Sequence, residues 1–167
     1  NVVGGGGTVR EALAEHASAL EEGKADVLGL YMVTQLFAKD EIPEGTLMDS
    51  YVTFLAGIFR SVRFGASSAH GKANMIRFNY FERMGAFRLD RATGRYAVVP
   101  GRMAAAVEAL SRDILLLQGN GDRDGPARMV AELAVSGPAL QADLDRLSEA
   151  GIPVDIVFEQ GLGVLGL

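Results

Sequence analysis

Cysteine is absent from this chain of 167 residues. Its absence excludes disulfide bonds, thiol catalysis and zinc sites built from cysteine, and it is consistent with a cytoplasmic location. Long apolar runs are also missing, because no stretch reaches the roughly 18 residues that suggest a membrane span. The first residues lack the pattern of a signal peptide. We therefore expect a cytoplasmic protein without a membrane partner.

Basic residues are not in excess: the chain has 16 Lys and Arg and 21 Asp and Glu, which gives a net charge of −5. The basic residues are scattered along the chain, which argues against nucleic acid as a partner. A hydrophobic content of 49% is that of an ordinary globular protein. The composition predicts one helical domain over residues 8–167, which follows a flexible Gly-rich lead over residues 1–7 and forms part of a larger polypeptide.

Apolar residues recur at helical spacing along most of the chain, and this pattern predicts a mainly α fold, a bundle of about six helices. Thr8 with Glu11, and Thr46 with Asp49, have the spacing of capping boxes at two helix starts. Ser67 or Ser68 is expected to cap a third helix. The predicted helices cover residues 8–39, 47–64, 68–84, 127–135 and 139–149, and another follows Pro100-Gly101 with Met103, Val107, Leu110, Ile114 and Leu117 on one face.

Two regions have the pattern of β-strands: one alternates apolar and polar residues, and the other is a short apolar run. Phe87 and Leu89, then Tyr96 and Val98, flank a turn and predict a small β-hairpin. Residues 152–158 are expected to form a short strand. Residues 27–37 are apolar nearly all round, so this half of the first helix is expected to be buried.

Three acids precede that apolar segment: Glu21, Glu22 and Asp26. Glu22 and Asp26 are four residues apart and share a helix face, while Glu21 lies about 100° to one side. Buried carboxylates need a cation, a metal or hydrogen-bond donors as partners. Spacing alone equally allows a solvated acidic face.

A second polar group lies on the helix over residues 68–84. His70, Asn74 and Arg77 are spaced i, i+4 and i+7, so they form one stripe that could bind a substrate carbonyl or carboxylate. An exposed polar stripe with a histidine near the helix start is the alternative interpretation.

The remaining motifs carry no function by themselves. His16, the second of two histidines, lies on the opposite helix face from Glu22, and two separated histidines make a poor zinc site. Residues 8–15 superficially resemble a Nudix box but lack its paired acids and its glycine. The glycines of residues 4–7 lack the strand and the Lys-Ser/Thr of a phosphate loop.

The stretch TVREALAEHASALEEGKADVLGLY, residues 8–31, resembles the Glu-Glu-x-x-Ala-Asp/Glu region of dipeptidyl-peptidase III zinc metallopeptidases, above all their bacterial and plant relatives. FGASSAHGKANMIRFNYF, residues 64–81, resembles the Ala-His-x-x-Ala-Arg segment of the same family. The resemblance covers roughly Thr8 to Gln118, and the residues after Gln118 carry no motif that can be transferred.

By this resemblance, Glu22 is the zinc-ligating glutamate, and Glu21 and Asp26 are acids that orient the zinc histidines. His70 matches the histidine that stabilises the reacting peptide carbonyl. Asn74 stands where better-known members have arginine, so a charge-based substrate contact there is in doubt, and we expect Arg77 to compensate.

The family's His-Glu-x-x-x-His motif occurs nowhere in this sequence. The resemblance therefore implies that the zinc histidines come from an upstream segment and that this chain is a C-terminal part of the zinc lobe of a larger two-lobed exopeptidase. Zinc is expected in the intact protein and not in this chain alone, which should be inactive. The expected partners are a peptide substrate and the remainder of the same polypeptide.

Two alternatives remain open. The chain could be a non-catalytic helical binding or scaffold domain, or a degenerate peptidase homologue, in which the acids pair with basic residues. The resemblance also allows a Nudix hydrolase domain upstream in the same protein.

Overall fold

The computed structural model describes residues 2–3, 5–156 and 158–166. The chain divides into two compact units, the first ending at Ser136 and the second beginning at Gly137. The sequence had predicted one domain over residues 8–167. The division lies next to Pro138. A proline disfavours the helical conformation at the residue before it, and Gly137 is accordingly extended (φ −75°, ψ 159°).

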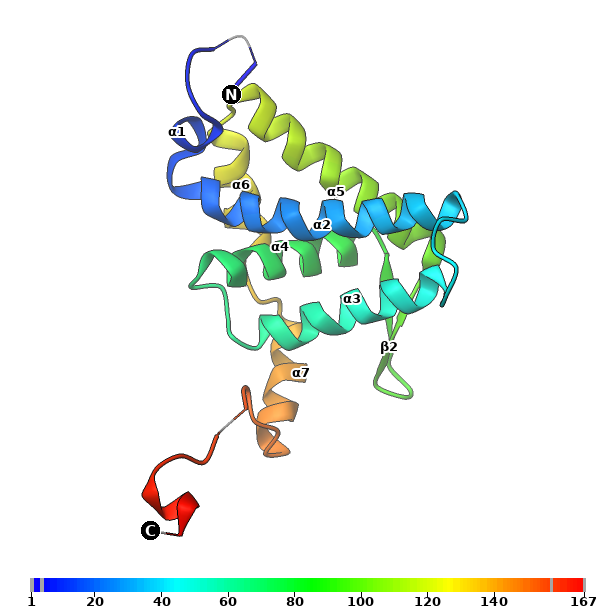
Figure 1. Ribbon diagram of the computed structural model, residues 1–167, viewed down its shortest axis with the longest axis vertical. Helices are drawn as coiled ribbons and strands as arrows, with labels where there is room; N and C mark the ends of the chain where they lie inside the picture. The colour runs from blue at the N-terminus through cyan, green and yellow to red at the C-terminus, as the bar shows by residue number, and fades with distance from the viewer. Residues whose placement is uncertain (1, 4, 157, 167) are drawn as a thin grey trace. The chain divides into compact units, whose positions relative to one another are not determined.

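The first unit is helical with one β-hairpin (Figure 1). Its elements are α1 (Val9–Leu13), the 3-10 turn η1 (Ala14–His16), α2 (Ala17–Ala38), α3 (Leu47–Val62), α4 (Ala69–Arg83), β1 (Phe87–Asp90), β2 (Arg95–Val98), α5 (Pro100–Asn120) and α6 (Asp124–Leu133). The second unit contains α7 (Pro138–Glu149) and η2 (Leu162–Leu165). The predicted mainly α fold with a small hairpin is confirmed.

Helix α4 is the centre of the first unit. It contacts α2 on one side and α3 on the other, and α5 packs against both α2 and α4. Figure 1 shows α2, α4 and α3 as neighbouring layers, with the hairpin at the end where α2 leads into α3. This arrangement brings the N-terminal half of α4 beside the acidic stretch of α2.

An unbroken helix over residues 8–39 was predicted, and this prediction is wrong. Its start is as expected, because the hydroxyl of Thr8 accepts the Glu11 N–H and the Glu11 carboxylate accepts the Thr8 N–H. The helix breaks at Ala14, which adopts φ 48° and ψ −123°. Positive φ at a residue with a Cβ is strained, and the change of direction leaves Leu13 fully buried.

The burial predicted for residues 27–37 is also only partly correct. Val27 and Leu30 are buried, but Met32 is 57% exposed and Leu36 is 37% exposed. The neighbouring helices cover one side of α2, so an apolar side chain on its other side stays in contact with solvent.

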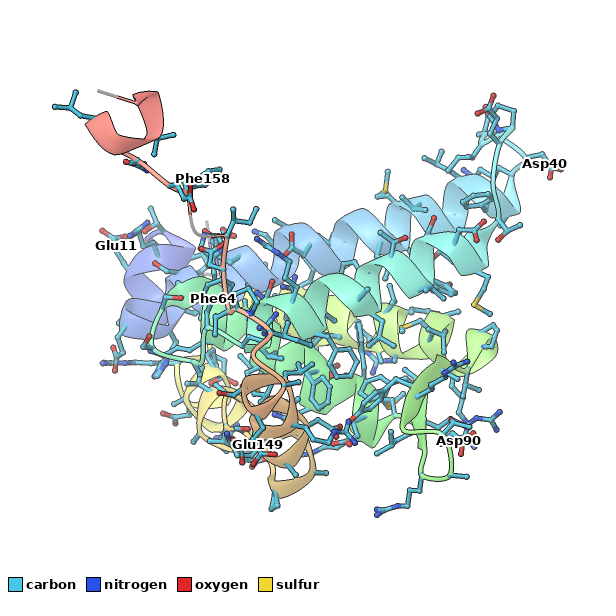
Figure 2. All side chains as sticks on the ribbon, turned by 90° about the horizontal axis from the view of Figure 1, so that it is seen from below. Glu11, Asp40, Phe64, Asp90, Glu149 and Phe158 are labelled. Atoms are coloured by element: carbon cyan, nitrogen blue, oxygen red, sulfur yellow. The ribbon has the colours of Figure 1, made fainter. Side chains whose placement is uncertain are left out.

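The starts of α3 and α4 also follow local capping. Thr46 and Asp49 form the expected capping box of α3, and the Ser68 hydroxyl accepts the Gly71 N–H at the start of α4. Between them the chain turns at Gly65, where φ is +74°. Phe64 in this turn lies at the opposite end of the α2–α3 pair from Asp40, as Figure 2 shows.

The hairpin pairs Phe87 with Val98 and Asp90 with Arg95 in antiparallel register. Its aromatic residues pack on α3 and α4 through a cluster in which Phe59 lies 5.3 Å from Phe78 and 4.4 Å from Tyr96, measured between ring centroids. The cluster fixes the C-terminal half of α4.

The strand predicted over residues 152–158 is wrong for its described residues, which adopt no regular structure; Val157 lies outside them. Pro153 cannot donate a backbone hydrogen bond to a neighbouring strand. None of the helices in the described part of the chain has the length and apolar character needed to cross a membrane.

Tyr80 links α4 to α5, because its hydroxyl donates to the Asp113 carboxylate at 2.7 Å. Burial and this hydrogen bond raise the pKa of Tyr80 above its ordinary value of 10.0. The folded state thus binds the phenolic proton more tightly than the unfolded state. This contribution to stability is complete below pH 10 and falls as the pH rises above it.

We therefore predict that urea midpoints of the chain fall between pH 9 and about pH 11, and that Tyr80→Phe reduces this slope. Tyr31→Phe, at a tyrosine within α2, is the control. Equal slopes in Tyr80→Phe and the unsubstituted chain would contradict the assignment.

Candidate functional site

The three acids of α2 lie at its surface rather than in the core. The side chain of Glu22 is 41% exposed, that of Glu21 52% and that of Asp26 53%, whereas Gly23 between them is buried. Helix α2 presents its small residues to the core and its carboxylates to the rim. The acids can thus meet groups on α4, α5 or a neighbouring segment.

Glu22 faces His70, one of the residues that the sequence singled out. The Nδ1 atom of His70 lies 3.3 Å from the Glu22 Oε2 atom, and the His70 side chain is 73% exposed. His70 is the second residue of α4, so the start of that helix places an imidazole beside the acidic stretch of α2. A carboxylate and an imidazole therefore share one open site.

Below this pair, Arg77 joins the two helices. Its Nη1 atom donates to the Asp26 carboxylate, and its Nη2 atom donates to the Asn74 Oδ1 atom at 2.6 Å. Asn74 in turn donates from Nδ2 to the backbone carbonyl of His70 at 2.8 Å. A hydrogen-bonded path thus runs from Asp26 on α2 to the backbone of His70 on α4.

Two residues of this stripe are buried, since Arg77 is only 3% exposed and Asn74 9%, whereas His70 at its start is exposed. A buried guanidinium needs partners for its donors. Its Nε atom has no hydrogen-bond partner among the described residues, but the group lies over the ring of Phe54, with Cζ 5.5 Å from the centroid. The aromatic face offsets part of the missing contact.

Glu21 points to a different set of partners. Lys24 donates to its carboxylate at 2.9 Å, and Gln118 on α5 donates at 3.4 Å. The hydrogen bond from Lys24 lowers the pKa of Glu21, with a smaller contribution from Gln118. Glu21 is therefore held ionised next to Glu22, with Lys24 as its counter-charge.

A cleft of about 660 Å³ opens beside His70, between α3 and α4. Its lining includes Asp26, His70, Asn74 and Arg77 together with apolar residues of α3. The cleft and the Glu22–His70 pair thus adjoin each other at the N-terminal end of α4. A substrate bound across His70 could reach into it.

The described residues do not form a complete metal centre. They contain no group of three His, Cys, Asp or Glu that could hold a metal ion. His16 lies beside Glu15 rather than Glu22, with 3.7 Å between the nearest side-chain atoms. Catalytic zinc needs about three protein ligands. Of the three exposed acids of α2, Glu22 is the one without a Lys or Arg partner among the described residues, so a metal ion held by it would need further ligands from elsewhere.

Sequence reasoning missed Gln118, Phe54 and the cleft wall on α3. Gln118 is 4% exposed and lies four residues after the buried Ile114, so a polar residue at an apolar position of the stripe was an available signal. Nothing in the spacing indicated Phe54, because its role depends on where Arg77 lies.

Gly71 allows the loop before α4 to approach the helix. A Cβ atom at Gly71 would lie 2.1 Å from the Gly65 carbonyl oxygen, a backbone atom. At Gly23, also buried in the site helices, a Cβ would lie 3.8 Å from its nearest neighbours, Ala73 and Ile114, which is ordinary contact. Alanine would thus clash with the backbone at position 71 but would fit at position 23.

We predict that Gly71→Ala lowers the free energy of unfolding by about 1–3 kcal/mol, because the loop must move. Gly23→Ala should instead change it by about 1 kcal/mol or less, since the gain in helix propensity compensates for tighter packing. Urea unfolding of both variants measures the difference. The close approach would be refuted if Gly71→Ala were as stable as Gly23→Ala.

Comparisons with known proteins extend this picture. No protein-family model matches the chain. The structure of a dipeptidyl-peptidase III from Caldithrix abyssi is 38% identical, with a TM-score of 0.81 over 89% of this chain and 28% of that one. The structure of a dipeptidyl-peptidase III from Corallococcus sp. strain EGB is 39% identical, with a TM-score of 0.82 over 94% of this chain and 29% of that one.

Among curated proteins, Nudix hydrolase 3 of Arabidopsis thaliana is 39% identical over 150 residues, which are 89% of this chain and 19% of that protein. The chain thus spans about a fifth of the curated relative and less than a third of the solved structures. The likeness is longer than the stretch from Thr8 to Gln118 that the motifs covered. In sequence and fold, this chain is dipeptidyl-peptidase III-like over about nine tenths of its length.

Proposed function

We propose that this chain supplies one side of the active site of a zinc-dependent peptidase that releases dipeptides from the N-termini of peptides. The observation that carries the proposal is the juxtaposition of Glu22 and His70, 3.3 Å apart, at an open site. The likeness to two dipeptidyl-peptidase III structures supports the peptidase class.

In this proposal Glu22 is a zinc ligand. Its carboxylate is exposed, and no lysine or arginine pairs with it among the described residues. Zinc bound there would act as a Lewis acid that lowers the pKa of water and polarises a carbonyl. The zinc histidines and the glutamate that activates water belong to a segment outside this sequence.

The proposal assigns Glu21 and Asp26 to orienting those histidines. Each carboxylate is about half exposed and so keeps acceptor capacity beyond its present partners, Lys24 and Gln118 for Glu21 and Arg77 for Asp26. A metal-bound imidazole needs an acceptor for its other N–H, and a carboxylate suits this role.

His70 would stabilise the oxyanion that develops when the peptide carbonyl is attacked. Its ring is exposed and its Nδ1 atom faces Glu22, which leaves Nε2 toward incoming substrate. Asn74 holds the His70 carbonyl and Arg77 holds Asn74, so both would act chiefly by positioning. Their direct contact with substrate remains part of the proposal.

The roles of Glu22 and His70 can be tested separately by substitution in the polypeptide that contains both this chain and a His-Glu-x-x-x-His segment. Glu22→Gln should lose bound zinc, measured by metal analysis after dialysis, because a neutral amide is a poor zinc ligand. His70→Gln should keep zinc but lower kcat by about 10²–10³-fold. His16→Gln, at the other histidine, is the control. Zinc retention by Glu22→Gln would contradict the ligand role.

The described residues of the chain hold no group of three potential metal ligands, so we predict that the chain alone binds zinc weakly and releases no dipeptides from peptide substrates. Isothermal titration with zinc and a peptidase assay check this directly. Tight stoichiometric zinc binding or robust hydrolysis would overturn the view that the site is partial.

A non-catalytic scaffold is the second candidate, favoured by one observation. Asp26 pairs with Arg77 and Glu21 pairs with Lys24, so two of the three acids already have cationic partners within the chain. A His-Glu-x-x-x-His motif upstream in the parent protein would favour the peptidase, and its absence would favour the scaffold.

The name of the Arabidopsis thaliana relative bears on the parent protein rather than on this chain. The match covers 19% of that relative, and residues 8–15 here lack the paired acids of a Nudix box. A Nudix hydrolase domain, if the parent protein carries one, would therefore lie outside this chain.

A further inference from the structure

The proposed chemistry uses the polar residues that line the cleft beside His70, but it gives no role to the apolar wall on α3. Its α3 wall presents Phe54, Gly57 and Ile58, and Phe64 stands at its rim with 47% of its surface exposed. Figure 2 shows Phe64 in the turn that leads from α3 to α4. An exposed phenylalanine beside other apolar side chains favours an apolar ligand group.

The polar side of the cleft carries no net charge that an ion could pair with. Arg77 lines it, but Asp26 and Asn74 already accept from its guanidinium, and Phe54 covers it. A charged ligand group entering here would lose water without gaining a partner of opposite charge, which is costly. An uncharged apolar group would lose nothing comparable.

Gly57 is the residue without a side chain in this α3 wall. A Cβ atom added there would meet no atom of the described residues within 4 Å, although the residue lies in the wall of the cleft. A side chain at this helical position would therefore meet no steric obstacle beside the cleft. The volume of about 660 Å³ lies within the roughly 300–1,000 Å³ of small-ligand sites.

We infer that this cleft is a specificity subsite for a large, uncharged apolar side chain of the peptide substrate, and that the glycine at position 57 determines the size it accepts. The inference rests on the proposed function, because His70 at the cleft mouth would hold the reacting carbonyl. The peptide chain would cross His70 and place one side chain between α3 and α4.

The first test is binding by the chain itself and requires no hydrolysis. The probes are four tetrapeptides of alanine with one Phe at each position in turn, and tetra-alanine as the reference. In NMR titrations, one Phe peptide should shift the amide signals of Gly57, Phe64 and His70 more than tetra-alanine does. Gly57→Leu should abolish this preference, because leucine occupies the cleft.

Gly29→Leu is the matched control. Gly29 also lies within a helix, is exposed, and would place its Cβ within 4 Å of no described atom, but it does not line the cleft. Both substitutions raise helix propensity alike. A preference for Phe that survives Gly57→Leu, or no shift at the cleft residues with any Phe peptide, would overturn the inference.

The second test uses the polypeptide that carries the full zinc site. The kcat/KM for the preferred Phe peptide relative to tetra-alanine should fall about tenfold or more in Gly57→Leu and stay unchanged in Gly29→Leu. Loss of the binding preference together with an unchanged kcat/KM ratio would show that the cleft is not a substrate subsite. Absence of any hydrolysis by the unsubstituted polypeptide would refute the peptidase, and the binding titration would then decide the cleft independently.

Discussion

The site depends on a buried guanidinium. Arg77 is 3% exposed and ties α2 to α4 through Asp26 and Asn74. Asp26 lies one helical turn after Glu22, and Asn74 lies one turn after His70. The ion pair therefore sets the register of the two helices that bring Glu22 and His70 to 3.3 Å.

Such a group is costly to bury and stays only where its donors are held. Asp26 and Asn74 accept from the two terminal nitrogens, and Phe54 covers the face of the guanidinium. Because Asp26 is 53% exposed, the pair is open to water on one side. The ion pair therefore contributes little to stability, since solvent screens a half-exposed carboxylate, and its main effect is to orient the two helices.

The same geometry explains why the site is open. The carboxylates of α2 lie at the rim, and the cleft between α3 and α4 begins next to them. One side of this region is built by the chain, and the other side faces outward. A partial site of this kind agrees with a chain that spans less than a third of the dipeptidyl-peptidase III structures it resembles.

Local features of the fold could be predicted from the sequence, whereas long-range ones could not. The caps at Thr8, Thr46 and Ser68 depend on residues three positions away, so spacing alone located the helix starts. The break at Ala14 carries no glycine or proline, and it follows from packing that no local pattern encodes. Likewise, the exposure of Met32 depends on which side of α2 the other helices cover.

The roles of the acids and of His70 were predicted from a family resemblance. Spacing alone could not identify them, because acidic helix faces and histidines at helix starts are common in proteins. The pairing of Asp26 with Arg77 links residues 51 apart in the sequence, which periodicity cannot reveal. The predicted polar stripe was correct as a stripe, but its burial required the position of α3. Gln118 became visible as a partner of Glu21 only once α5 lay beside α2.

The central claim is that Glu22 coordinates a metal from one side of a shared site. Anomalous diffraction at the zinc absorption edge, from crystals of the polypeptide that includes this chain and the zinc histidines, tests it most directly. The account predicts a zinc peak within about 2.2 Å of a Glu22 carboxylate oxygen, with His70 facing the same space. A zinc peak bound elsewhere, with the Glu22 carboxylate in bulk solvent, would contradict it.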